Sequence, residues 1–423
     1  MKPRLISLDV LRGLTIILMT IVNNPGDWGH VYSPLLHVEW HGCTPTDLVF
    51  PTFLFIVGVS VVLATPSKNL TVHSLQKIIT RTLRIFCLGL FLSFFSKINA
   101  FGLEGLPLLS LRLVITAIVV VALFRDYDRK LQFYVSVIVF LTMMILAFGG
   151  FKDYETVRIP GVLQRIAIVY FIVSLLYHKT TWKTQAIIGI VVLLAYWAFM
   201  TLIPVPGIGA PNFEKGTNLA AWLDHYLLPG HLWATSKTWD PEGILSTLPA
   251  IGTGIAGLLV GTLLTNSFSK DKKALYLFIA ALSAIVAGQL WNIVFPINKA
   301  LWTSSYVLYA AGIASLCLVV LYYVIDVLGI SGWTKFFVIF GVNPMVVFFF
   351  SGIIPRMLSS IKVAYPNNSA HESIGLQAYF YEFQLSPLFS NPINASLAYA
   401  LIYLTLWFVI LYILYRNKLV FKV

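Results

Sequence analysis

The sequence predicts an all-α polytopic membrane protein, a bundle of about 12 (10–12) transmembrane helices with both termini cytoplasmic. Of its 423 residues, 58% are hydrophobic and 11% are charged, whereas a soluble domain carries about 25% charged residues. Apolar stretches long enough to cross about 30 Å of hydrocarbon as helices recur along the whole chain. These two observations exclude a soluble globular protein.

The hydropathy pattern places the candidate spans in order along the chain. They are expected near 8–24, 47–66, 81–97, 108–124, 131–150, 160–178, 184–204, 245–266, 274–295, 304–326, 334–352 and 394–415. The stretch 81–97 is short, and the pair within 108–150 is the weakest. The first apolar run lacks a small-residue cleavage site, so it is read as a retained helix and not as a signal peptide.

The orientation follows from the charges of the connecting loops. With the N-terminus inside, most of the 29 Lys and Arg residues fall in cytoplasmic segments, as the positive-inside rule requires. The net charge of +12 therefore needs no nucleic-acid partner. The extracytoplasmic loops are then about 25–46, 205–243 and 353–393, and residues 1–423 form a single transmembrane domain.

His37 is the first candidate catalytic residue, because an imidazole with a pKa of about 6.5 can both accept and give a proton near neutrality. Asn23 ends the first span and Asp47 begins the second, so a folded-back loop can bring all three together. The ordinary alternatives are a surface histidine and an aspartate that caps the second helix. The crowding of Trp40 and His41 into the same loop favours chemistry.

No metal site or disulfide framework is expected. The three cysteines are far apart and form no CxxC pair. His37, Glu39 and His41 fit no standard spacing of metal ligands.

Polar residues inside or beside apolar spans form the second group of candidates. A charge within a span is costly unless it is paired or faces a cavity, which singles out Arg165 and its neighbour Gln164. Arg12 lies three residues after Asp9, so the alternatives are a simple ion pair and a contact with an anionic ligand. The remaining candidates are Arg84 near the cytoplasmic side, Asp240 and Glu242 ahead of a Gly-rich helix, Ser305 after an outer turn, and Asn343, which interrupts a span with Pro344. Capping of the helix is the ordinary explanation for Asp240.

Several stretches together resemble the heparan-α-glucosaminide N-acetyltransferase family of the transmembrane acyltransferase superfamily. They occur in the family's order and are RLISLDVLRGLTIILMTIVN (4–23), HVEWHGCTPTDLVFPTFLFIVG (37–58), RIPGVLQR (158–165), LIPVPG (202–207), DPEGIL (240–245), NKALWTSSYV (298–307) and LYRNKLVFK (414–422). His41 departs from the asparagine that usually follows the Trp. That departure concerns the acceptor side more than the chemistry.

The resemblance implies helices around a central pore and transfer of acetyl from cytosolic acetyl-CoA to the amine of glucosamine or a glucosamine-containing glycan. His37, three residues before Trp40, matches the family's catalytic histidine, and Asn23 and Asp47 match its asparagine and aspartate. Trp40, Arg165 and Glu242 fall within its motifs. Arg12 and Arg84 would neutralise the CoA phosphates.

Two rival functions stay open at this point. One is an acyltransferase with another cell-envelope sugar as acceptor. The other is a secondary transporter of small sugars or anions, for which many spans and a buried arginine are also natural. The expected location is a bacterial inner (cytoplasmic) membrane, and a homodimer is compatible with the sequence.

Overall fold

The computed structural model describes residues 5–65, 67–365 and 373–421. Its helices are α1 (Ile6–Asn23), α2 (Val49–Ala64), α3 (Val72–Phe94), α4 (Gly105–Phe124), α5 (Arg129–Phe148), α6 (Val162–Lys179), α7 (Trp182–Leu202), α8 (Leu219–Leu227), α9 (Ile244–Thr265), α10 (Lys270–Trp291), α11 (Ser304–Leu321), α12 (Lys335–Val342), α13 (Pro344–Ser360), α14 (Leu376–Tyr379) and α15 (Pro392–Arg416). The strands β1 (Lys362–Ala364) and β2 (Ser373–Gly375) pair in antiparallel register.

The described residues contain eleven helices that are long and apolar enough to cross a membrane. A twelfth crossing is formed if α12 and α13 are one span, which is bent by 73° at Asn343. The prediction of about twelve spans is therefore confirmed, as is the interruption at Asn343 and Pro344, where the proline begins the second half of the broken helix.

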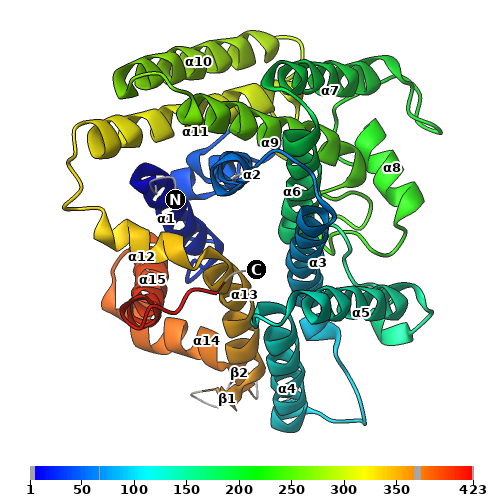
Figure 1. The fold of residues 1–423 in the computed structure, drawn as a ribbon. Coiled ribbons are helices and arrows are strands. Elements are labelled where there is room, and N and C mark those ends of the chain that lie inside the picture. Colours follow the sequence, from blue (N-terminus) through cyan, green and yellow to red (C-terminus); the bar gives the residue numbers. More distant parts are fainter. Residues whose placement is uncertain (1–4, 66, 366–372, 422–423) are drawn as a thin grey trace.

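The helices divide into an inner and an outer set (Figure 1). In α1, α2 and α9, 67% of the residues of the apolar window are buried inside the protein, whereas in α4 and α5 only 17% are. Helices α4 and α5 are also strongly apolar, so their exposed side chains are suited to lipid. The inner helices form the part of the protein that can hold a polar site away from lipid.

Glycines bring two inner helices into backbone contact. A Cβ on Gly58 of α2 would lie 2.1 Å from the carbonyl oxygen of Gly254 in α9, and one on Gly257 would lie 2.1 Å from the carbonyl oxygen of Phe55. Small residues at such positions allow close helix packing in membranes. At Gly58 and Gly257 the missing side chain therefore serves close helix packing.

Two boundaries and the content of one loop differ from the expectations. The short span 81–97 is wrong, because α3 begins at Val72, with Thr71 and Ser74 forming a capping box. The loop 353–393 begins later than expected, because α13 continues to Ser360. The loop 205–243 is not purely irregular and contains the nine-residue α8.

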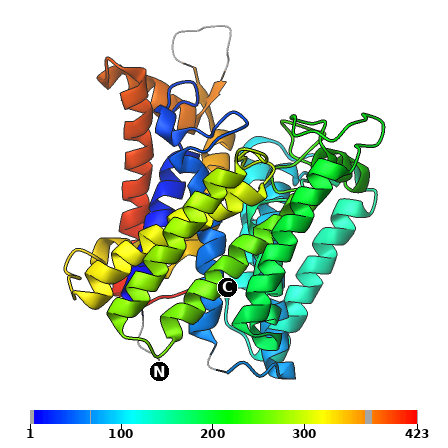
Figure 2. The same cartoon turned by 90° about the horizontal axis from the view of Figure 1, so that it is seen from above.

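The long loops gather at one end of the helices, which we call the loop face (Figure 2). Hydrogen bonds join them there: Gly26 N–H donates to Ser396, Trp40 Nε1 donates to Phe213, and Gly42 N–H donates to Ile297. The N-terminus lies at the opposite end (Figure 2).

Candidate active site

An aspartate–histidine pair lies on the loop face at the start of α2. Asp47 is in the short turn Pro45–Leu48 that leads into the helix, and its carboxylate accepts a hydrogen bond from Nδ1 of His37 at 2.7 Å. The same carboxylate accepts from Val38 N–H and from the backbone and hydroxyl of Thr44, at 3.1, 2.9 and 3.0 Å. The aspartate is fully buried, whereas the His37 side chain is 49% exposed. The expectation of a first-turn aspartate that also contacts His37 is confirmed.

This geometry sets the proton position on the ring. A carboxylate bonded to Nδ1 favours the tautomer with hydrogen on that nitrogen, so Nε2 carries the free lone pair. The pair therefore has the arrangement of a general base with its orienting carboxylate. The nearby thiol of Cys43 is no competing nucleophile, because burial and the charge of Asp47 raise the pKa of Cys43 to about 12.

Lys299 is a third charged residue of this site, and it was not among the predicted site residues. Its Nζ lies 3.1 and 3.2 Å from the two ring nitrogens of His37 and 3.8 Å from the carboxylate of Asp47. The sequence placed it in a polar turn between two spans, where a lone lysine is ordinarily an interfacial anchor. Only the chain fold brings it to His37.

A second cluster of charges lies beside the first turn of α9. Arg158 forms a bidentate pair with Asp240, at 2.8 and 2.6 Å, and also donates to Glu242. Burial opposes the charge of Arg158, but these two carboxylates outweigh it and raise its pKa. The expected capping of α9 by Asp240 is wrong, because Asp224 of α8 accepts the first helical N–H, from Ile244, at 2.8 Å.

Arg165 is a buried arginine that joins the start of α6 to the start of α9. It is 1% exposed in the first turn of α6 and donates to the carbonyl of Gly243 and the hydroxyl of Ser246. Its guanidinium lies 5.0 Å from the ring centre of Trp302, which packs edge-on against Tyr306. The Tyr306 hydroxyl donates to the backbone carbonyl of Asp47 at 2.6 Å, so a chain of buried contacts joins Arg165 to Asp47.

Two donor atoms of Arg165 have no partner. Its Nε and Nη1 are buried, and among the described residues neither makes a hydrogen bond. An unsatisfied buried donor costs about 1–3 kcal/mol, more when it is charged. A buried guanidinium with open donors is typical of a binding position for an oxygen of a ligand or water.

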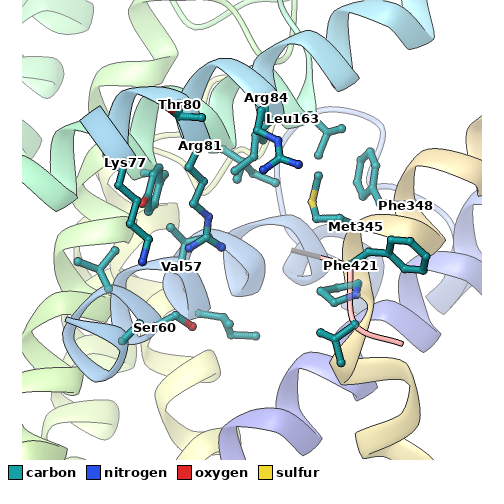
Figure 3. A pocket seen from close by; sticks show the side chains of 18 of the residues that line it. Val57, Ser60, Lys77, Thr80, Arg81, Arg84, Leu163, Met345, Phe348 and Phe421 are labelled. Atoms are coloured by element: carbon teal, nitrogen blue, oxygen red, sulfur yellow. The ribbon is translucent and has the colours of Figure 1, made fainter. Parts of the chain in front are cut away.

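A basic cavity of about 680 Å³ lies between the inner helices (Figure 3). Its charged lining residues include Arg12, Lys77, Arg81, Arg84, Arg129 and the acid Asp126. The side chains of Lys77, Arg81 and Arg84 extend from α3 into this space (Figure 3). Helix α3 thus supplies most of the positive charge, from Lys77 ahead of the expected span and from Arg81 and Arg84 at its start.

Other contacts hold two of these cations in place. Arg12 donates to Asp9 at 3.0 Å and to Ser60 at 3.1 Å, so the predicted ion pair exists and the same side chain also lines the cavity. Arg84 donates to the carbonyls of Leu123 and Arg125 at the end of α4. Both residues therefore combine a structural contact with a position on the cavity wall.

Asn343 fixes a further wall of the cavity. Its amide donates to the carbonyl of Leu419 at 3.0 Å and accepts from the N–H of Phe421 at 2.9 Å. Val420 and Phe421 then line the cavity, and Figure 3 shows the Phe421 ring near Phe348. The predicted binding residue Asn343 thus acts by holding the C-terminal segment.

The remaining predicted residues have mainly structural contacts. Asn23 is exposed at the end of α1, and within the described ranges no hydrogen bond joins it to His37 or Asp47. Gln164 packs where α6 meets Gly89 of α3. Trp40 donates to the carbonyl of Phe213, and Ser305 donates to the carbonyl of Phe295. His41 lies 3.4 Å from the side-chain amide of Asn298.

Helix α2 links the two halves of the site. It begins directly after Asp47, and its residues Phe53 and Ser60 line the cavity. At 1.5 Å per residue, the thirteen positions from Asp47 to Ser60 span about 20 Å, and Phe53 lies about 9 Å from Asp47. The arrangement suits a long anionic molecule whose reactive end is close to the loop face.

The comparisons with known proteins agree with this geometry. Residues 4–155 match the family described as "Heparan-alpha-glucosaminide N-acetyltransferase, catalytic". The chain is 28% identical to the human (Homo sapiens) heparan-alpha-glucosaminide N-acetyltransferase over 100% of its length, and 26% identical to the mouse (Mus musculus) protein over 99%. In both cases it spans 60% of the relative's length. Its described residues thus contain eleven to twelve candidate membrane-crossing helices, and the chain is similar to these N-acetyltransferases over nearly all of its own length.

Proposed function

We propose that the protein transfers acetyl groups from acetyl-CoA to the amine of glucosamine or a glucosamine-containing glycan across the membrane. The observation that carries this proposal is the two-ended site: a basic cavity at one end of α2 and an aspartate–histidine pair at the other. A transporter would need the cavity but would have little use for an oriented imidazole on the opposite face.

The cavity suits the nucleotide end of CoA. Its lining carries several Lys and Arg side chains, and phosphates are bound in proteins by such cations. Lys77 and Arg81 on α3 and Arg129 at the start of α5 would hold phosphates, and Arg12 would contribute from α1. Acetyl-CoA, as the substrate, would supply the activated acetyl group.

On the loop face, His37 would prepare the acceptor. A glucosamine amine is nucleophilic only when neutral, so Nε2 of His37 would take a proton from its ammonium group. Asp47 would keep Nδ1 protonated and stabilise the imidazolium. Asn23 would then donate a hydrogen bond to the developing negative charge, a contact whose loss typically costs about 2.7–4 kcal/mol of barrier.

The neighbouring loop residues would form the acceptor's side of the site. Trp40 and His41 line a shallow pocket on the loop face together with Glu39, Glu214 and Lys215. We place this face outside the cytoplasm and both termini inside, in a bacterial inner membrane. The basic cavity would then open toward cytosolic acetyl-CoA, as the positive-inside rule favours.

Acetylation of glucosamine by the purified protein tests this proposal. Acetyl-CoA consumption and N-acetylglucosamine formation are measured for the unchanged protein, for His37→Ala and for His30→Ala. His30 is a matched control, because it is as exposed as His37 and also pairs with an aspartate on the same loop, Asp27 at 2.6 Å, but that aspartate is exposed and not buried.

We expect activity in the unchanged protein and in His30→Ala, and loss of at least 100-fold in His37→Ala with acetyl-CoA binding retained. Equal activity in His37→Ala would remove this histidine from the mechanism. No activity and no acetyl-CoA binding in any form, together with sugar flux in proteoliposomes, would favour a transporter instead.

A further inference from the structure

The ammonium of Lys299 lies over the face of the His37 ring. Its Nζ is 3.1 Å from Nδ1 and 3.2 Å from Nε2. These two nitrogens flank the ring carbon Cε1, so an atom equally close to both would overlap with Cε1 if it lay in the ring plane. Because Nζ is out of the plane, it does not cover the in-plane lone pair of Nε2. Lys299 therefore approaches His37 without blocking its basic nitrogen.

The turn that carries Lys299 is firmly built. The Asn298 side chain accepts from Leu301 N–H at 2.9 Å, and Asn298 N–H donates to the hydroxyl of Thr303 at 3.1 Å. Trp302 is fully buried in a left-handed conformation with φ of 53°, which few residues other than glycine adopt. A turn held in this way positions the lysine and limits its freedom to move away from His37.

Opposite charges meet at the ring. Asp47 contacts it from the start of α2, and Lys299 contacts it from the turn between α10 and α11. Burial lowers the pKa of Lys299, and the charges of Asp47 and Glu242 oppose this shift. In general, a carboxylate beside an imidazole favours the imidazolium, which cannot accept a further proton, and an adjacent cation opposes it.

We propose that Lys299 is a positioning residue for the acetyl transfer, whose positive charge keeps His37 neutral with Nε2 free to take the acceptor's proton. This inference rests on the proposed function. In the step it assists, an N–H bond of the acceptor ammonium breaks and an Nε2–H bond forms on His37. The two adjacent cations then favour release of that proton to solvent, which restores the base.

Two substitutions separate the effect of the Lys299 charge from that of the side chain's size. Lys299→Met keeps an unbranched side chain of similar length without the charge, and Lys299→Arg keeps the charge. Lys237→Met is the matched control, because Lys237 is exposed on the loop face. The rate of acetyl transfer and the KM for acetyl-CoA are measured between pH 5 and 9.

We expect the acid limb of the rate profile to move up by about 1 pH unit in Lys299→Met, the size of the interaction of two unit charges about 3 Å apart in water. The rate at pH 5, well below the limb, should fall about tenfold while the KM for acetyl-CoA stays within threefold. Lys299→Arg should restore the position of the limb. A profile of Lys299→Met that superimposes on that of the unchanged protein would overturn the inference.

A second measurement does not depend on activity. Diethyl pyrocarbonate reacts with neutral imidazole, so its rate of reaction at the His37 peptide, followed by mass spectrometry across the same pH range, reports the neutral fraction. We expect the midpoint of this rate to be higher by about 1 pH unit in Lys299→Met. An unchanged midpoint would refute the role of Lys299, whereas lack of acetyl transfer in every form would refute only the proposed function.

Discussion

Replacing Asp47 with Asn tests whether the aspartate sets the proton position on His37. One carboxylate oxygen accepts from His37, and the other accepts from Val38 and from both groups of Thr44. An asparagine has one acceptor oxygen and one NH₂ group, and three donors favour placing the oxygen toward Val38 and Thr44. Its NH₂ group would then face Nδ1 of His37, which must become an acceptor. The ring would carry its hydrogen on Nε2, where the base needs a lone pair.

The size of the effect follows from this reversal. General-base catalysis contributes about 10²–10⁴-fold to a rate, so kcat of Asp47→Asn should fall by that factor. The fold should survive, because the three hydrogen bonds from Val38 and Thr44 can still be made to the asparagine oxygen. The lost charge costs little by comparison, since a hydrogen bond to a charged group contributes only about 1.5–3 kcal/mol. The assay pairs acetyl transfer with the thermal unfolding midpoint and with acetyl-CoA binding.

The reasoning would be refuted by an Asp47→Asn protein that keeps kcat within tenfold of the unchanged protein while its unfolding midpoint is lowered. That outcome would make the aspartate a structural capping residue of the turn Pro45–Leu48 and nothing more. Asp47→Glu is the control, because it keeps a carboxylate with two acceptor oxygens. Acetyl-CoA binding is measured for both variants, so that loss of the chemical step is distinguished from loss of substrate binding.

Four further predictions concern other parts of the molecule. Lys77→Ala and Arg81→Ala should each raise the Kd for acetyl-CoA about tenfold and leave the unfolding midpoint unchanged, since both side chains extend into the cavity; unchanged affinity in titration calorimetry would exclude them from phosphate binding. Gly58→Leu should destabilise the protein by about 1–3 kcal/mol or more in denaturant titrations, because even a Cβ would lie 2.1 Å from a backbone oxygen of α9. Asn343→Ala should loosen the C-terminal segment, seen as faster amide hydrogen exchange at the Phe421 N–H, which its side chain now accepts. Iodoacetamide at pH 8 should label Cys43 about 10³-fold more slowly than a free thiol, because its thiol stays protonated up to a pKa of about 12; rapid labelling would contradict its burial.

The spans could be predicted because lipid demands long apolar helices whatever their partners. The prediction was wrong where polar residues that line the cavity interrupt the apolar pattern of a helix. The first turns of α3 carry polar residues that include Lys77, and the expected span began only at Arg81, nine residues too late. Those charges are tolerated because they face the basic cavity and not lipid.

The aspartate–histidine pair could be anticipated because His37 and Asp47 are close in sequence and both lie at the same end of α2. Lys299 could not, because its contact with His37 joins residues 262 positions apart and depends on how α10 and α11 pack. Asp224 was missed for the same reason: it caps α9 from α8, whereas the nearer Asp240 pairs with Arg158. Local sequence identifies suitable chemistry, but long-range packing decides which suitable residue is used.

The rigidity of α2 bears on how an acetyl group could cross the membrane. Gly58 packs against the α9 backbone, and the same helix carries Asp47 at its start and lines the cavity near its end. Movement of α2 relative to α9 would separate these close backbone contacts, so the two helices act as one unit. A carrier bound along about 20 Å of α2 needs no helix motion to join the two faces, because its own length does so. The continuous course of α2 from the turn that holds Asp47 to the basic cavity therefore suits group transfer at a fixed site.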